Sequence, residues 1–252
     1  MCVPMNLSGI SKDTFFGKLL RSPLKLIPPT AVVPILQGPL RGKKWIAGSS
    51  TNGCWVGSFE YEKQQAFRGE VARGDVVYDL GANVGFYSLL ASVLTGEKGH
   101  VYCFEPLARN IAYLKRHIEM NGIQNCTIVE AAVANENGQA GFDPSPERST
   151  AHLSEHGEKT VRTVRIDTLV QSGEIRPPNV MKIDIEGAEA EAFKGAAQTI
   201  ESHRPTIFLA THGPAVHRAC LQFLLDRQYV LVSLTPDGIE SAAELIARPR
   251  AS

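Results

Sequence analysis

Short apolar runs alternate with segments of helical periodicity from residue 75 onward. The runs indicate strands, and between them apolar side chains recur at the spacing of one helix face. The expected strands are 76–80, 100–105, 126–130, 139–142, 160–166, 180–184, 206–210, 229–234 and 245–248. The expected helices are 84–94, 107–121, 188–200 and 215–228. Apolar strands that alternate with helices indicate a mostly parallel α/β sheet covered on both faces.

The first 70 residues have a different character. The segment up to residue 45 is rich in proline, and two apolar runs, 45–47 and 54–56, flank a polar stretch. This arrangement predicts a small hairpin, and a helix over 59–72 follows it. We therefore expect residues 1–70 to form an arm, hairpin and helix that act as a lid or cap. Residues 71–252 are expected to form the main domain.

The composition is that of a globular protein. Hydrophobic side chains make up 43% of the 252 residues and charged ones 21%, which excludes disordered, collagen-like and coiled-coil chains. The 26 basic and 26 acidic side chains cancel, so we expect no nucleic acid partner. The cysteines form no CxxC pair, and prolines interrupt the amino-terminal apolar runs. We expect a cytoplasmic monomer or homodimer with no transmembrane segment.

Charge is distributed unevenly. Residues 1–70 hold nine basic and four acidic side chains, whereas residues 71–252 hold 17 and 22. Either the basic segment is a solvated extension, or it contacts an anionic substrate, a partner or a membrane surface. We expect residues 1–44 to assist acceptor binding and not to belong to the core.

The strand at 76–80 ends in a glycine-rich turn. Asp79 lies at the strand tip, where its carboxylate can meet a cationic amine. Gly81 permits a tight turn, Gly85 lets the next helix lie close, and Asn83 is placed to cap that helix. Because ligands of parallel sheets bind beyond the carboxyl ends of the strands, this turn is a candidate cofactor site.

A second acidic residue follows the next strand. Glu105 precedes Pro106 and comes 20 residues after Gly85, an offset typical of carboxylates that bind ribose. The alternative is that Glu105 only caps a helix.

Asn83 and Phe86 stand where a nicotinamide site needs glycine. The turn suits a cofactor with an amino acid end and no phosphate, and S-adenosylmethionine is such a molecule.

Two further strand ends carry candidate catalytic groups. Lys182, Asp184 and Glu186 alternate along one face, and three ionisable groups among apolar neighbours are costly to bury without a use or a partner. The alternative is a local Lys182–Glu186 ion pair beside acids at a helix start. His212 precedes Gly213 and is the best-matched proton acceptor near neutral pH. Asp184 is the alternative base, and His212 could instead be a loop or cap residue. We expect no metal site.

Taken together, these motifs resemble the FkbM family of S-adenosylmethionine-dependent methyltransferases. The likeness is carried by residues 77–87, 103–106 and 182–189, within a similarity over roughly residues 45–250. It implies a class I methyltransferase fold, a Rossmann-like doubly wound sheet of seven strands with the last one antiparallel. It also implies O-methylation of a hydroxyl on a sugar or another natural product.

The resemblance implies specific cofactor contacts as well. The residues expected to bind the cofactor are Glu62, Asp79, Gly81, Asn83, Gly85, Glu105, Pro106, Glu130, Ala131 and Asp184, with Glu130 and Ala131 near the adenine. Residues 1–70 and 143–160 are expected to select a small-molecule or carbohydrate acceptor. A nitrogen acceptor is the alternative to a hydroxyl. The competing hypotheses are a nicotinamide-dependent oxidoreductase and a methyltransferase-like binding module without catalysis.

Overall fold

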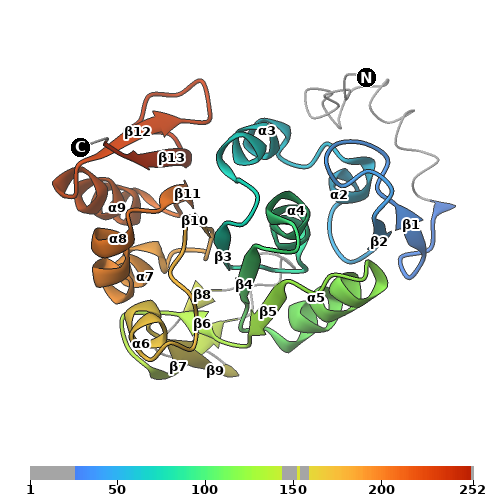
Figure 1. Ribbon diagram of the computed structural model, residues 1–252, viewed down its shortest axis with the longest axis horizontal. Coiled ribbons are helices and arrows are strands. Elements are labelled where there is room, and N and C mark those ends of the chain that lie inside the picture. Colours follow the sequence, from blue (N-terminus) through green and yellow to red (C-terminus); the bar gives the residue numbers. More distant parts are fainter. Residues whose placement is uncertain (1–25, 144–151, 154–158, 251–252) are drawn as a thin grey trace.

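The computed structural model describes residues 26–143, 152–153 and 159–250. Its central strands are β3 (Val76–Leu80), β4 (His100–Phe104), β5 (Cys126–Val129), β10 (Val180–Ile183), β11 (Thr206–Ala210), β12 (Tyr229–Ser233) and β13 (Glu244–Pro249). They form one seven-stranded sheet in the order β12-β13-β11-β10-β3-β4-β5 (Figure 1). Only β13 runs antiparallel to its neighbours. The prediction of seven strands with the last one antiparallel is confirmed.

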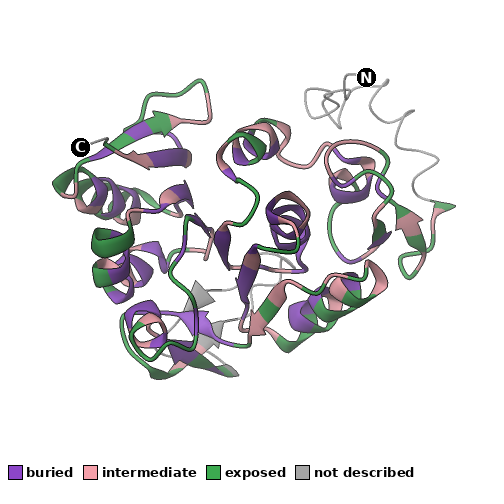
Figure 2. Ribbon diagram, in the orientation of Figure 1, coloured by how far each residue is buried: buried purple, intermediate pink, exposed green. Residues whose placement is uncertain are grey.

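Helices cover both faces of this sheet. One face carries α3 (Tyr61–Glu70), α4 (Phe86–Thr95) and α5 (Ala108–Met120), and the other α6 (Ile166–Gln171), α7 (Glu189–Gly195), α8 (Ala197–His203) and α9 (Pro214–Asp226). Side chains alternate between the faces, because Val77 packs in the cluster around α4 and Tyr78 in the cluster around α7 and α9. The inner strands β3, β4, β10 and β11 are consequently buried almost throughout, whereas the edge strands β5 and β12 have exposed positions (Figure 2). The helix predicted over 188–200 is two helices, divided at Ala196.

A smaller sheet lies beside the main one. It contains β6 (Ala132–Val133), β7 (Gly138–Asp143), β8 (His152–Leu153) and β9 (Lys159–Val164) in the order β6-β9-β7-β8. The strands predicted at 139–142 and 160–166 correspond to β7 and β9. Most of segment 143–160, which we expect to help select the acceptor, lies outside the described residues.

The amino-terminal hairpin differs from the predicted one. β1 (Val32–Pro34) pairs antiparallel with β2 (Lys44–Ile46), whereas the predicted partner of β2 forms α2 (Asn52–Val56). Within α2 the indole N–H of Trp55 donates to the side-chain oxygen of Asn52 at 3.2 Å. The helix ends at Gly57, whose φ of 86° stops it in the left-handed conformation. The prediction of a hairpin over residues 45–56 is therefore wrong, because its expected second strand forms the helix α2.

The described part of the amino-terminal segment belongs to the core. Ile35 and Leu40 are each 1% exposed and lie in the same apolar cluster as Leu89 of α4. The expectation that residues 1–44 stand apart from the core is wrong for these two side chains. Among the residues described, no helix combines the length and apolar character needed to cross a bilayer.

A buried histidine ties this segment to the main domain. The ring of His117 stacks on Trp45 with centroids 3.9 Å apart. Its Nε2 accepts the backbone N–H of Ile46 at 3.1 Å, and its Nδ1 donates to the carbonyl of Val84 at 2.7 Å. Burial lowers the pKa of His117 to about 4, so the ring is neutral when it makes these contacts.

Candidate active site

A cavity of about 310 Å³ opens beyond the carboxyl ends of β3, β4 and β10, and its size is within the range of small-molecule sites. The amino-terminal segment closes one side with Ser50, Thr51, Cys54, Phe59 and Glu60. From the strand ends come Gly81, Ala82, Asn83, Val84, Phe104, Glu105, Pro106, Leu107, Lys182, Asp184, Ile185 and Glu186. Phe86, Tyr87, Asn110, Ala131, Ala132, Val133 and Ala188 complete the lining.

The turn after β3 forms part of the cavity wall, and its glycines are required by close contacts. Gly81 has a φ of 78°, and a Cβ atom there would lie 2.0 Å from the carbonyl oxygen of Asp184. A Cβ atom on Gly85 would lie 2.5 Å from the side chain of Leu114. No side chain fits at Gly81, because backbone from two neighbouring strand ends meets there. Gly85 serves packing between α4 and α5.

Asn83 and Glu105 connect the first two strand ends. The backbone N–H of Asn83, a residue with a φ of 51°, donates to Oε2 of Glu105 at 2.8 Å. The side-chain oxygen of Asn83 accepts the N–H of Val84 at 2.8 Å. Asn83 therefore does not cap α4, whose N-cap is Gly85. The predicted capping role was wrong because the left-handed turn directs this side chain to its own neighbour.

Glu105 is a buried carboxylate at the cavity wall. It is 4% exposed, and its Oε1 accepts the N–H of Leu107 at 3.0 Å and the side-chain amide of Asn110 at 3.2 Å. Burial raises its pKa above the usual range. The helix α5 begins at Ala108, two residues after Pro106. Glu105 thus organises the start of this helix and also faces the cavity.

Asp79 lies behind the cavity wall. It is 1% exposed and is absent from the lining. Its Oδ2 accepts the hydroxyl of Ser88 at 2.6 Å, and its Oδ1 lies 3.3 Å from the ammonium of Lys182 without a hydrogen bond. Lys182 also donates to the carbonyl of Gly81 at 2.9 Å. The Asp79 carboxylate therefore holds Lys182 beneath the turn.

A second buried lysine, Lys63, joins segments that are far apart in the sequence beside Asp184. The ammonium of Lys63, on α3, lies 3.1 Å from Glu60, 3.0 Å from Glu244 and 3.9 Å from Asp184. Burial alone would lower the pKa of Lys63, but these three carboxylates raise it above its ordinary value. Both lysines also lower the pKa of Asp184 against the effect of burial. Asp184 is therefore ionised.

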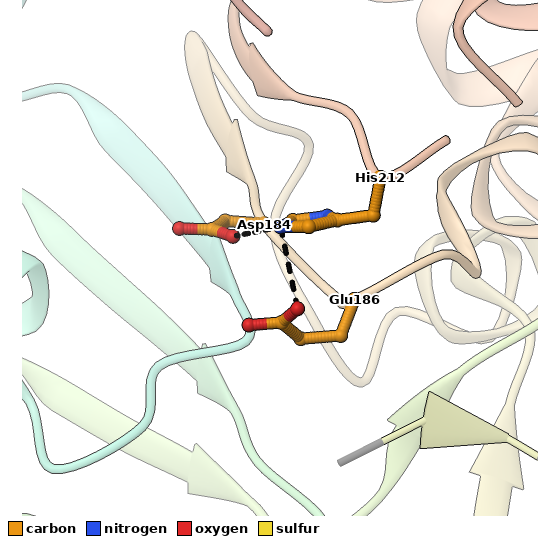
Figure 3. A group of neighbouring side chains, drawn as sticks. All are labelled: Asp184, Glu186 and His212. Carbon is orange, nitrogen blue, oxygen red and sulfur yellow. Dashed lines mark ion pairs between the residues drawn. The ribbon is translucent and has the colours of Figure 1, made fainter. Parts of the chain in front are cut away.

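His212 meets the acidic groups that follow β10 (Figure 3). Its Nε2 lies 3.3 Å from Glu186 and 3.8 Å from Asp184. Its Nδ1 lies 2.8 Å from Oε1 of Glu189, a fully buried residue on α7. That hydrogen bond raises the pKa of His212, and Glu186 and Asp184 add to the increase against the opposing effect of burial. Burial raises the pKa of Glu186.

The structure brings most, but not all, of the predicted site residues to the cavity. Ala131 and Pro106 line it, whereas Glu130 is exposed and pairs with Lys115 at 2.6 Å. Glu62 is exposed and lies outside the lining, and His212 lies behind Asp184 and Glu186.

Sequence reasoning missed four charged residues of this site, namely Glu60, Lys63, Glu189 and Glu244. The spacing of Glu60 and Lys63 along a helix start was a usable signal for one pair. The others meet their partners only through the fold.

Asp184, Glu186 and His212 also share a property of cation sites. Each offers one ligand atom, and these atoms lie within 4.8 Å of one another. Lys63 and Lys182 lie close to Asp184, and their charges oppose a divalent cation there. The expectation of no metal stays a prediction.

The proteins that this chain is similar to are methyltransferases. The sequence pattern of the methyltransferase FkbM domain matches residues 79–231. The chain is 33% identical over 137 residues to the hexuronic acid methyltransferase AglP of Haloferax volcanii. The aligned region covers 53% of this chain and 54% of AglP. It is 26% identical over 193 residues to the 2-O-methyltransferase NoeI of Sinorhizobium fredii, covering 66% of this chain and 76% of NoeI.

A crystal structure shows the same fold. The FkbM methyltransferase of Methylobacillus flagellatus superposes with a TM-score of 0.51 at 21% identity, over 69% of this chain and 43% of that protein. The chain thus covers about half the length of AglP and less than half of this structural neighbour. The α/β sheet with one antiparallel strand is the class I methyltransferase fold.

Proposed function

Because the chain belongs to the FkbM methyltransferase family, we propose that it transfers the methyl group of S-adenosylmethionine to a hydroxyl group of a carbohydrate. The single observation that carries this proposal is the cavity shared by the Gly81 turn, Glu105, Asp184 and Glu186. It joins the candidate cofactor contacts to the candidate catalytic groups. The names of AglP and NoeI support a carbohydrate hydroxyl as the acceptor.

The residues of the cavity fit this cofactor. The Gly81 turn offers a backbone surface that no side chain obstructs, and Glu105 is a buried carboxylate for the ribose hydroxyls. Glu105 and Asp184 follow strands that are two positions apart in the sheet, which separates them by roughly 10 Å. With the cofactor bound, Asp184 and Glu186 would face its cationic end in place of Asp79, which lies behind the wall, and Ala131 and Pro106 would flank the adenine. When bound, the cofactor supplies a methyl group already activated by its sulfonium charge.

The protein then has two tasks, to align the acceptor hydroxyl and to accept its proton. Asp184 and Glu186 lie at the cavity wall and can accept hydrogen bonds from the acceptor. We assign proton acceptance to Nε2 of His212, directly or through one of these carboxylates. Glu189 holds Nδ1 of the same ring, so the neutral ring keeps its free electron pair on Nε2, toward Asp184 and Glu186.

The test is a binding and transfer assay with the full chain. Calorimetry compares S-adenosylhomocysteine with NAD, and a methyl-labelled cofactor is incubated with a panel of carbohydrate, small-molecule hydroxyl and amine acceptors, followed by mass analysis of the products. The proposal expects binding of the adenosyl compound, no binding of NAD, and label on a carbohydrate oxygen. NAD binding without adenosyl binding, or transfer only to nitrogen, would contradict it.

A further inference from the structure

The charges around the cavity define a class of acceptor. Resting on the proposed methyl transfer, we infer that the acceptor carries no carboxylate, so that an uncharged sugar or a cationic amino sugar is preferred over a uronate. The balance between acidic and basic groups at the strand ends sets this preference.

The described lining of the cavity is strongly acidic. Four carboxylates reach it, those of Glu60, Glu105, Asp184 and Glu186, and Lys182 is its single basic residue among the described parts of the chain. The amino-terminal segment lines the cavity with Glu60 and with uncharged residues, and its described basic side chains Arg41, Lys43 and Lys44 are absent from the lining. An anionic acceptor therefore meets carboxylates on the wall.

Neither buried lysine is available to an anionic acceptor. The Lys182 ammonium is 3.3 Å from Asp79 and 3.6 Å from Asp184, and it donates to a backbone carbonyl. Lys63 is 2% exposed, is absent from the lining, and has carboxylates of Glu60 and Glu244 at about 3 Å. The two ammonium groups are thus shared among more carboxylates than they can neutralise.

The balance stays negative when the other participants are added. Around the catalytic end, the described residues place six carboxylates against two lysines and His212: Asp79, Glu60, Glu244, Asp184, Glu186 and Glu189. Even a protonated His212 leaves an excess of acids. The cofactor adds one net positive charge, which is too little to cancel the excess. In a partly buried site, such an excess repels a further anion with little screening.

This acceptor class differs from that of one relative. AglP is named for a hexuronic acid, whereas the site described here favours a sugar that lacks that charge. The name of NoeI specifies a 2-O position and no charged acceptor. The names of the two relatives therefore do not determine whether the acceptor of this chain is charged. The charge balance of its own cavity is what supports an acceptor without a carboxylate.

The test uses three acceptors that share one ring and differ at a single position, which bears a hydroxymethyl, an aminomethyl or a carboxylate group. Transfer of labelled methyl by the full chain is measured for each one as kcat/KM. We expect the uronate to be at least about tenfold poorer than the better of the other two, since one repelled charge at a partly buried site has effects of this order. Raising the salt concentration should narrow the difference.

A charge-neutralising variant locates the effect. Glu186→Gln removes one negative charge at the wall and should reduce the discrimination against the uronate severalfold. Glu191→Gln removes a surface acid that pairs with Lys194, and it should leave the ratio unchanged. Equal or better use of the uronate by the unmodified chain overturns the inference while leaving methyl transfer intact. Absence of transfer to every carbohydrate of the acceptor panel, these three included, overturns the proposed carbohydrate function, and this inference with it.

Discussion

Oε1 of Glu189 lies 2.8 Å from Nδ1 of His212, and it also accepts the backbone N–H of Gly187 at 3.0 Å. The fully buried carboxylate therefore fixes the ring in one orientation and fixes the loop after β10 as well. Its second oxygen has no hydrogen-bond partner. A buried carboxylate stabilises positive charge on the ring it contacts, so Glu189 links the shape of the loop to the proton affinity of His212.

The first prediction concerns the pH dependence of activity. A base must be deprotonated to act, and His212 has a pKa above the ordinary value of 6.5. The acidic limb of kcat should therefore lie above pH 6.5 and fall as the pH drops through the pKa of His212. Glu189→Gln removes the negative partner and should move this limb to lower pH. Glu191→Gln, on the same helix, is the control, and an identical limb in both variants would contradict the role of Glu189.

The second prediction concerns His212 itself. If its ring accepts the acceptor proton, His212→Ala should lower kcat by about 10²–10⁴-fold while cofactor binding survives. Single-turnover transfer of labelled methyl measures the first effect, and calorimetry measures the second. If the variant keeps most of its kcat, either Asp184 accepts the proton or the protein contributes mainly by positioning the acceptor hydroxyl against the methyl group. Asp184→Asn then serves as the comparison.

The third prediction concerns the cofactor. Glu105→Ala should weaken binding of S-adenosylhomocysteine by about 1.5–3 kcal/mol, the scale of hydrogen bonds to a charged group. Glu130→Ala is the matched control, because this exposed side chain pairs with Lys115 outside the cavity. Calorimetry should show near-normal affinity for the control. Equal losses in the two variants would contradict the assignment of the ribose to Glu105.

The fourth prediction concerns stability in acid. The pKa of His117 is lowered from 6.5 to about 4, so the unfolded chain binds this proton more readily than the folded one. The stability due to neutral His117 is complete above pH 6.5 and is lost as the pH falls toward 4, by roughly 3 kcal/mol. Urea unfolding across this range measures the slope. His117→Gln should be less stable at pH 7 and should show a flatter dependence, and an unchanged slope would exclude His117 as its cause.

The fifth prediction compares two leucines of the amino-terminal segment. Leu40 is 1% exposed, whereas Leu36 is 53% exposed. Leu40→Ala should reduce the free energy of unfolding by about 2–5 kcal/mol through lost burial and a residual cavity. Leu36→Ala should change it by less than about 0.5 kcal/mol. Thermal or urea unfolding distinguishes the two, and equal effects would show that this segment does not share the core.

The sequence by itself determined the order of the main elements and the chemistry at the strand ends. Apolar strands and amphipathic helices are local patterns, so β3, β4, β10 and β11 were predictable, and so was the register of Gly81 and Glu105. Parallel strands bring their carboxyl ends to one edge of the sheet, so the sequence alone predicted that Glu105, Asp184 and His212 share that edge.

Only the tertiary structure decided the partners. Lys63 and Glu244 are separated by 181 positions and Ile46 and His117 by 71, so no local spacing joins them. The turn that precedes α3 places Glu60 at the cavity, where Glu62 had been expected. Asp79 is buried and therefore lies behind the cavity wall. Partner choice depends on which side chains are desolvated together, and that is a property of packing between segments and not of the pattern within any one of them.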